Sequence, residues 1–424
     1  TLTRTYDAVG KVAAAGVDAG FVANDFDKLP IFKDMVEERD RYGNVFVRVP
    51  KLYWSLTANG AARAWAVSLW KHPGFELPKC FWDAAKSREL PYILVGKYKA
   101  ALSADATKLE SKAGKSPLVN KNIIEFRNYA LANNANGQAG YQLLDLTTYA
   151  VLRTLMRVEF ATLNIQSIAQ GYSTGQWSAS HLATVAGTGV NQIIVANATA
   201  SAYVAGQCID IDTAAGTMGD RAIAKDRLIT AINVYDASNK AIVFDGTAVN
   251  IAIGNVVRNC GQRTGSADAV TATSGSVASN ADGKRPFVYR GIESLFGDLW
   301  QWIDGVNIDE RQAWVCDNPT QYASNVFASP YQQLAYPNGA ADGYAVTMGY
   351  DATHPEAEFA TGVAGGFSST YYSDYYYQTT GQRVALVGGR WVDGALCGPA
   401  FWALNTSATG ASVTLGGRLL RKPL

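Results

Sequence analysis

Two short patterns in the sequence carry residue types that could perform chemistry. The segment Gly171–Gly175 (GYSTG) matches the G-x-S-x-G pattern of serine hydrolases, in which a strand precedes the serine and a helix follows it. A long helical pattern precedes this serine instead, so we interpret the segment as a loop. Asp210 and Asp212 begin like a calcium-binding loop, but Ala214 and Ala215 stand where a third ligand and the turn glycine belong. Neither pattern predicts an active site.

The histidines and cysteines are too scattered to predict a metal site. His72, His181 and His354 share no H-x-x-x-H spacing, and the five cysteines contain no C-x-x-C pair. An odd number of widely separated cysteines predicts isolated reduced thiols. We therefore expect no catalytic residues, no metal and no cofactor. The cysteines are Cys80, Cys208, Cys260, Cys316 and Cys397.

A cluster of tyrosines suggests binding rather than catalysis. Successive side chains of a strand alternate between its two faces, so these tyrosines cannot all enter one core. Tyrosine combines a large contact area with a polar tip, and binding loops are rich in it. Two interpretations remain open: a recognition surface, or an aromatic-rich strand packed on both faces. The tyrosines are Tyr371, Tyr372, Tyr375, Tyr376 and Tyr377.

The composition excludes several classes of protein. Hydrophobic residues make up 48 %, which is enough for a core, and charged residues only 17 %, against about 25 % in ordinary soluble proteins. The 37 Lys and Arg nearly balance the 36 Asp and Glu without a basic run, so we expect no nucleic-acid partner. No apolar stretch approaches the ~18 residues of a membrane span, so we expect no membrane insertion. No signal-peptide core follows the first residues, which predicts cytoplasmic synthesis without Sec-type export.

The hydrophobic pattern predicts two halves of one domain with an insertion between them. Alternating apolar residues predict a strand over 45–54. The sequence predicts a short helix over 120–132. Three- and four-residue steps predict a stronger helix over 141–170, which ends at Gly171. From about 190 the pattern changes to short β-like runs separated by Gly, Asn, Ser and Thr. We predict an N-terminal tail or attachment segment (1–24), a first half (25–189), an inserted β-rich subdomain (190–285) and a second half (286–424).

The C-terminal part of the chain carries a resemblance to a known family. Residues 297–305 (GDLWQWIDG) resemble the Gly-Asn-Val-Trp-Glu-Trp signature of the formylglycine-generating-enzyme type of C-type lectin fold. The segments 387–391 (VGGRW), 401–405 (FWALN) and 415–420 (LGGRLL) are similar to the C-terminal region of phage-encoded C-type-lectin proteins. These include variable proteins of the diversity-generating-retroelement type, among them tropism determinants of phage tail fibres. The resemblance implies an α+β C-type lectin fold with an inserted small β subdomain.

The resemblance also implies which residues bind and which support them. Diversified members interleave variable positions with a fixed Gly, Trp and Leu frame, and the variable region here would span about 370–420. The implied structural frame consists of Trp300, Trp302, Gly388, Gly389, Trp391, Trp402, Gly416 and Arg418. The implied ligand-binding face consists of Tyr375, Tyr377, Arg390, Val392, Asp393, Ala395, Leu396, Cys397, Phe401, Ala403 and Thr406.

By this resemblance the chain is a binding protein and not an enzyme. The sulfatase-activating enzymes of this fold depend on cysteines near the end of the chain, and Cys397 alone does not reproduce such a pair. We expect a phage or prophage receptor-binding protein at the tail tip or fibre of the virion, where it binds a bacterial cell-surface protein or glycan. It would contact other virion tail components and form a homo-oligomer, with a trimer favoured. The alternatives are an invariant structural tail or head-decoration protein, and an oxidase or hydrolase on this fold.

Overall fold

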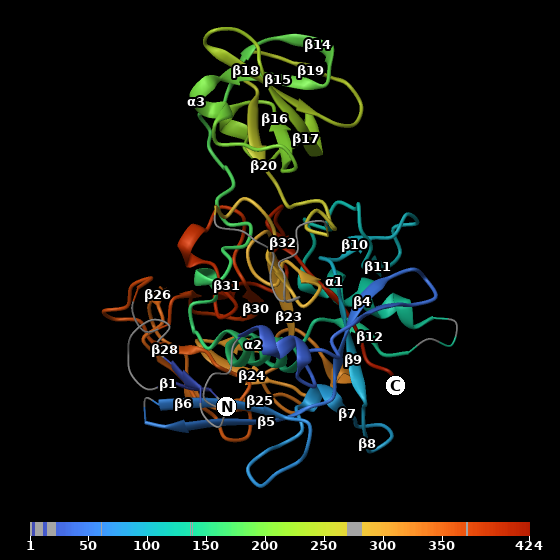
Figure 1. Ribbon diagram of the computed structural model, residues 1–424, viewed down its shortest axis with the longest axis vertical. Helices are drawn as coiled ribbons and strands as arrows, with labels where there is room; N and C mark the ends of the chain where they lie inside the picture. Colours follow the sequence, from blue (N-terminus) through green and yellow to red (C-terminus); the bar gives the residue numbers. More distant parts are fainter. Residues whose placement is uncertain are drawn as a thin grey trace.

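The structure is a computed structural model that describes residues 2–4, 12–14, 23–60, 62–135, 137, 139–268, 282–369 and 372–424. Strands predominate over helices, and the longest described helix packs among curled sheets. This arrangement is compatible with the predicted α+β class. Figure 1 shows a main body that holds both chain ends and, at one end of the long axis, a smaller β-rich part in green to yellow.

The largest sheet of the described chain comes from the C-terminal half. Its strands are β23 (Trp300–Asp309), β24 (Gln312–Val315), β25 (Gln332–Pro337), β26 (Gly343–Tyr344), β29 (Tyr375–Gln378), β30 (Arg383–Val387), β31 (Trp402–Thr406) and β32 (Leu415–Gly416). The order is β25-β24-β23-β30-β31-β29-β26, and β32 pairs with β23 beside this path. β31 therefore lies between β30 and β29, with hydrogen-bonded neighbours on both edges.

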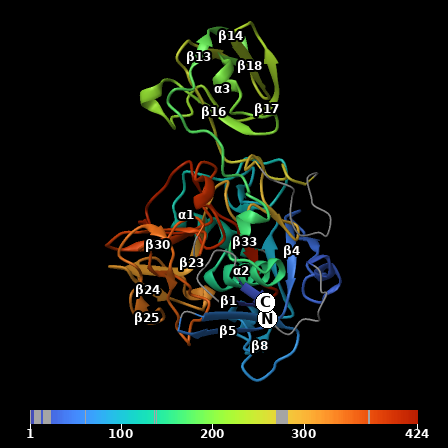
Figure 2. The same ribbon diagram turned by 60° about the vertical axis from the view of Figure 1, so that its left-hand side comes forward.

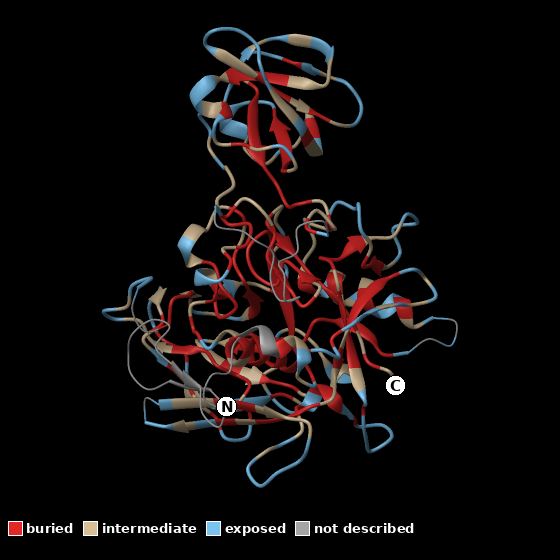
Figure 3. Cartoon of the chain, in the orientation of Figure 1, coloured by how far each residue is buried: buried red, intermediate tan, exposed pale blue. Residues whose placement is uncertain are grey.

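The two faces of this sheet contact different apolar clusters. Trp300 and Trp302, two residues apart on β23, share one face and pack in a cluster with Leu386 and Phe401. Ile303 points to the opposite face and joins the main core. Both tryptophans are buried, as predicted, and Figure 3 shows buried strands running through the centre of the body.

A second sheet joins the two predicted halves of the domain. Its strands are β3 (Glu37–Arg39), β4 (Val45–Pro50), β9 (Tyr92–Gly96), β12 (Tyr141–Leu143) and β33 (Leu419–Arg421), in the order β12-β33-β9-β4-β3. The last strand of the chain, β33, lies between two strands of the first half. The halves before and after the insertion are thus parts of one body.

The predicted attachment segment, residues 1–24, is described only at 2–4, 12–14, 23 and 24, and its other residues lie outside the described parts. The two triplets form β1 (Leu2–Arg4) and β2 (Val12–Ala14). They extend the hairpin of β5 (Tyr53–Asn59) and β6 (Ala62–Ser68) into a sheet of order β2-β1-β6-β5. Where it is described, the segment therefore pairs with the main body instead of forming a separate tail.

Several two-stranded pairs complete the described strands. They are β7 (Trp82–Asp83) with β8 (Arg88–Glu89), β10 (Ala101–Leu102) with β11 (Leu109–Glu110), β14 (Gly187–Val190) with β19 (Val249–Ile251), β21 (Val288–Tyr289) with β22 (Ile292–Glu293), and β27 (Thr347–Met348) with β28 (Ala360–Gly362).

The two long helices begin at capping side chains. α1 (Ile123–Leu131) starts with a capping box between Asn122 and Glu125 and confirms the helix expected over 120–132. α2 (Leu146–Phe160) starts where Asp145 Oδ1 accepts a hydrogen bond from the Thr148 amide at 2.8 Å. α2 packs against β6 and β23 in the main core.

The helix predicted over 141–170 was too long at both ends. Residues Tyr141–Leu143 form β12, because their partner is the last strand of the chain, which local periodicity does not reveal. At the other end Ala161 adopts a left-handed conformation with φ 50° and ends the helix well before Gly171.

The inserted part has its own sheet and core. Its strands are β13 (Ala183–Val185), β15 (Gln192–Ala196), β16 (Cys208–Asp212), β17 (Ala224–Val234), β18 (Asn239–Phe244) and β20 (Val256–Asn259), in the order β13-β15-β18-β17-β16-β20, with the short helix α3 (Asn197–Ala200). Its apolar cluster runs from Ala183 to Val257. Figure 2, turned by 60°, shows the same separation from the main body.

The insertion therefore starts and ends earlier than the predicted 190–285. The two connecting segments bond to each other, with the Gln176 amide donating to Asn259 Oδ1 at 2.7 Å. Beyond this point the chain returns to the main body, where the Gln262 amide donates to Asp298 Oδ1 at 2.7 Å. The end of the insertion is invisible in the sequence because the returning segment is as polar as the insertion loops.

Candidate functional site

Tyrosine side chains form a patch at one edge of the largest sheet. We define the tyrosine face as Tyr344 of β26 and Tyr375 and Tyr377 of β29, all half-buried. The ring centroids of Tyr344 and Tyr375 are 5.1 Å apart, and those of Tyr375 and Tyr377 are also 5.1 Å apart. The alternate residue Tyr376 is buried on the opposite side of β29, in the main core. Tyr372 is buried as well, and Tyr371 lies outside the described residues.

The tyrosine face rests on a rigid aromatic base. The ring of Phe401 lies 5.4 Å from Tyr377 and 6.0 Å from Tyr375, measured between centroids. Trp300 packs edge to face against the same Phe401 ring at 4.5 Å. Aromatic pairs of this kind contribute about 0.5–1.5 kcal/mol beyond the area they bury. The base therefore holds the two tyrosines in place before any ligand arrives.

An ion pair lies beside these rings. Arg390 Nε donates to Asp393 Oδ1 at 3.0 Å, and the Arg390 amide donates to Asp393 Oδ2 at 2.9 Å. About 40 % of the Arg390 side chain is exposed, whereas Asp393 is nearly covered. Burial, followed by the negative charge of Asp393, raises the pKa of Tyr377 further above neutral pH, so its hydroxyl is a neutral donor. The site thus offers a neutral hydroxyl donor and a guanidinium next to flat apolar rings.

The loop between β30 and β31 is fixed to the core by glycine and tryptophan backbone contacts. The Gly388 amide donates to the Phe401 carbonyl at 2.9 Å, and the Trp391 amide donates to the Asp298 carbonyl at 3.0 Å. Gly389 has φ 81°, and a Cβ there would lie 2.6 Å from Cys397 Sγ. No larger residue fits at this position without moving the loop.

Arg418 ties the C-terminal strand to the first half of the chain. This buried guanidinium donates from Nη1 to the Gly96 carbonyl at 2.8 Å and from Nη2 to the Glu293 carbonyl at 2.6 Å. Its Nε donates to Gln301 Oε1 at 2.9 Å. The residues of the implied frame are all buried, which agrees with a supporting role: Trp300, Trp302, Gly388, Gly389, Trp391, Trp402, Gly416 and Arg418.

The structure brings together only part of the predicted binding face. Tyr375, Tyr377 and Leu396 pack at the edge of one apolar cluster, half-exposed. Arg390 and Asp393 lie within electrostatic reach of Tyr377. The remaining positions that are not buried lie in other surroundings: Val392 beside Trp391 and Tyr172, Ala395 exposed in the turn Gly394–Leu396, and Thr406 at the end of β31.

Three predicted binding residues are core residues instead. Phe401 is covered by the tyrosines and Trp300. Ala403 lies on β31 opposite both Tyr377 and Leu386, so neighbouring strands enclose it. Cys397 is buried beneath Gly389 and donates from Sγ to the Arg390 carbonyl at 3.4 Å. Their burial follows from strand pairing and loop closure, which the spacing of residues does not show.

Two aromatic residues were missing from the sequence-based set, and one of them belongs to the tyrosine face. Tyr344 reaches the face through pairing of β26 with β29, a contact between segments with no shared motif. Phe367 is 63 % exposed in the glycine- and serine-rich segment that follows β28. For Phe367, the only signal in the sequence was the presence of an aromatic residue in a stretch of otherwise small and polar residues.

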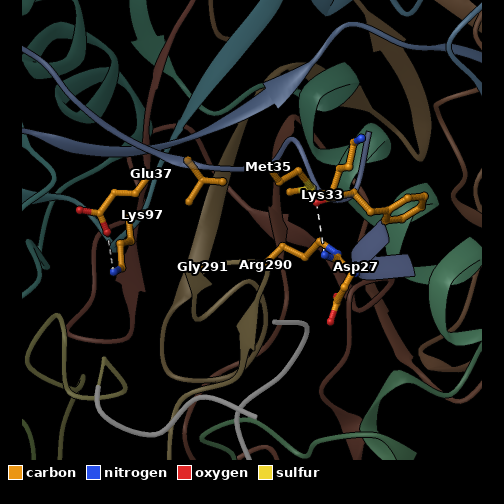
Figure 4. Close-up of a pocket in the computed structure, with 9 residues that line it drawn as sticks. Asp27, Lys33, Met35, Glu37, Lys97, Arg290 and Gly291 are labelled. Atoms are coloured by element: carbon orange, nitrogen blue, oxygen red, sulfur yellow. Dashed lines mark hydrogen bonds and ion pairs between the residues drawn. The ribbon is translucent and has the colours of Figure 1, made fainter. Parts of the chain in front are cut away.

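A hollow of about 310 Å³ lies where residues 27–37 meet the loop at Gly291. Figure 4 shows Arg290 directed toward Asp27 on one side and Glu37 next to Lys97 on the other. The closest nitrogen–oxygen distances are 2.9 Å for Arg290 and Asp27 and 3.0 Å for Lys97 and Glu37. Because Arg290 already pairs with Asp27 and Lys97 with Glu37, we interpret this hollow as a structural contact between the two segments.

One group of potential metal ligands, from the insertion and the connecting segment after it, already has arginine partners. It consists of Asp210, Asp226 and Cys260. Asp210 Oδ2 lies 3.0 Å from Arg221 Nε and 3.1 Å from Arg258 Nη2. These guanidinium groups occupy the place that a cation would take.

Comparison with known proteins gives no further guidance. No protein-family model matches the chain, and no curated protein matches it. In the parts of the chain that the structure describes, none of the helices has the length and apolar character needed to span a membrane.

Proposed function

We propose that this chain is a phage or prophage receptor-binding protein of the virion tail tip or fibre. It recognises a bacterial cell-surface protein or glycan through the tyrosine face and Arg390, without catalysis. The resemblance of residues 297–305 and of the C-terminal segments supports this assignment. The fold we propose is the formylglycine-generating-enzyme type of C-type lectin fold, in which the motif tryptophans belong to the core. Trp300 and Trp302 are buried on β23, an interior strand of the largest sheet, in agreement with this proposal.

The observation that carries the proposal is the support of half-exposed tyrosines by buried rings. Tyr375 and Tyr377 rest on Phe401, so their orientation costs little entropy on binding. Tyrosine and arginine are enriched among residues that dominate binding energy. Flat rings beside hydroxyl groups and a guanidinium suit both sugar rings and polar protein loops.

Diversification by a retroelement, if it occurs here, would be confined to the positions that are not buried. Replacement of Cys397, Phe401 or Ala403 would disturb the core. Because these three residues are buried, this part of the sequence fits the alternative, an invariant virion protein with the same fold, better than a diversified protein. A neighbouring reverse-transcriptase gene with a template repeat that varies only the accessible codons would support diversification. The positions that are not buried as whole residues are Tyr375, Tyr377, Arg390, Val392, Asp393, Ala395, Leu396 and Thr406, although the side chain of Asp393 is nearly covered.

Adsorption of the purified chain to host cells tests the proposal. Tyr375→Ala removes a ring from the tyrosine face and should weaken adsorption by at least ~1 kcal/mol. Tyr235→Ala is a matched control, because Tyr235 is 48 % exposed and lies in the insertion. Equal adsorption of the two variants would contradict a binding role for the tyrosine face.

A further inference from the structure

Three polar side chains converge in the main body from separate segments. Asp317 follows β24, whereas His354 and Glu356 belong to the segment between β27 and β28. Their potential ligand atoms all lie within 4.8 Å of one another. His354 and Glu356 have side chains only 3 % exposed, and Asp317 is 27 % exposed.

The distances between these atoms match the coordination shell of a small cation. His354 Nδ1 lies 3.3 Å from Glu356 Oε1 and 3.7 Å from Asp317 Oδ1. Ligands about 2.0–2.1 Å from a tetrahedral Zn²⁺ ion lie about 3.3 Å from one another. One imidazole nitrogen and two carboxylate oxygens are also a donor set that Zn²⁺ accepts.

A hydrogen bond at Nε2, the ring nitrogen that does not face the carboxylates, sets the orientation of the His354 imidazole. His354 Nε2 lies 3.1 Å from Gln332 Oε1, and this amide oxygen accepts the Nε2 proton. In the neutral ring Nδ1 then presents a lone pair toward the carboxylates of Glu356 and Asp317. A lone pair that faces carboxylate oxygens is repelled by them unless a proton on Nδ1 or a metal cation lies between. A second hydrogen-bonded ring nitrogen is also the usual arrangement of a metal-binding histidine.

The local charge also favours a bound cation. A third carboxylate, Asp351, accepts a hydrogen bond from the His354 amide at 3.2 Å. Apart from His354 itself, the cationic partner of Asp317 among the described ion pairs is Lys79, at 3.8 Å and with 53 % of its side chain exposed. Glu358, two residues beyond Glu356, is by contrast paired with Arg153 and Arg157 in the core. The cluster of Asp317, His354 and Glu356 therefore retains an excess of negative charge.

We propose that Asp317, His354 and Glu356 bind one divalent transition-metal ion, with Zn²⁺ the best fit. Asp317 also lines a hollow of about 390 Å³, so this ligand has a side that faces the hollow. The ion ties the segment 349–359 to the end of β24, two segments far apart in sequence.

Titration of the chelator-treated full-length chain with ZnCl₂ in a calorimeter tests this site. We expect one Zn²⁺ per chain, and a loss of affinity of about tenfold or more in Asp317→Asn and in Glu356→Gln. His181→Gln serves as the matched control, because His181 bonds to the Tyr203 hydroxyl in the insertion and should leave the affinity unchanged. CoCl₂ bound at the same site should give the visible absorption of a tetrahedral complex in the wild type and not in Glu356→Gln.

Two results would overturn the proposal. One is the absence of Zn²⁺ uptake by the folded wild-type chain, which is what a protonated His354 bridging both carboxylates predicts. The other is uptake that persists unchanged in Asp317→Asn, as adventitious binding at the exposed His72 would. Because Asp317 is partly exposed, this variant should fold even if Glu356→Gln does not.

Discussion

The ring of Phe401 packs edge to face against the ring of Trp300, with their centroids 4.5 Å apart. Phe401 also contacts Tyr375 and Tyr377, so a single buried ring connects the core tryptophan to the half-exposed tyrosines. The proposed binding face is therefore the outer layer of a continuous aromatic stack. Its geometry depends on the same contacts that stabilise the fold.

Removal of either buried ring should destabilise the protein. Trp300→Ala and Phe401→Ala each leave a cavity in the cluster below the tyrosines, and we expect a loss of about 3–5 kcal/mol in the free energy of unfolding. Denaturant unfolding measures this loss. Thr406→Ala, at the half-exposed end of β31, should change it by less than ~0.5 kcal/mol. An unchanged unfolding midpoint in Phe401→Ala would show that this ring is not part of the core.

The insertion should be removable without loss of the main body. The insertion has its own core, and the Gln176–Asn259 contact joins its two connecting segments. We therefore choose Trp177 and Arg258 as the ends between which the insertion is deleted. A chain in which a short Gly/Ser linker joins these two residues should retain the near-UV circular dichroism of the main body. The matched variant that joins residue 189 to residue 286 also deletes Gln262 and its bond to Asp298, and should be less stable. Aggregation of the first variant would contradict the assignment of an independent insertion.

The stability of the protein should depend on the protonation of Asp374. Burial raises the pKa of this carboxyl to about 7, while the Ala400 amide donates to it at 2.6 Å. Because the folded state holds the proton more tightly than the unfolded state, this contribution is complete below about pH 4 and is lost as the pH rises through about 7. Asp374→Asn should flatten the decline of unfolding free energy over this range, by at most about 1.4 kcal/mol per pH unit. The exposed variant Asp236→Asn should keep the wild-type slope, and a wild-type slope in Asp374→Asn would contradict the assignment.

The chain should assemble into a homo-oligomer, with a trimer as our expectation. Its low content of charged residues, 17 %, suits extensive interfaces, which are depleted of charge at their centres. Multi-angle light scattering measures the mass of the assembly directly. A monomer of 45.4 kDa at micromolar concentration would exclude this arrangement.

Local patterns in the sequence predicted part of this structure, and long-range pairing decided the rest. The burial of Trp300 and Trp302 followed from a dense aromatic motif, and the short helix predicted over 120–132 is found as α1. Tyr141–Leu143 fit a helical pattern equally well and became a strand only because β33 pairs with them.

The candidate sites show the same limit. Ala403 is buried because β29 and β30 flank it, and both pairings join segments whose order in the sheet no local pattern reveals. No metal site was expected, since the three histidines share no motif spacing. His354 meets Asp317 only through the folding of the segment before β28 against the end of β24. Ligand sets assembled from separate segments leave no periodic signal in a single sequence.

The central claim is that the tyrosine face binds and the tryptophan frame supports it. Host-cell adsorption and melting temperature, measured together on four alanine variants, test this division directly. Tyr375→Ala and Arg390→Ala should weaken adsorption by at least ~1 kcal/mol and leave the melting temperature nearly unchanged. Trp391→Ala and Trp402→Ala should lower the melting temperature, because both rings are buried. An equal loss of thermal stability in all four variants, with no separate loss of adsorption, would contradict the account.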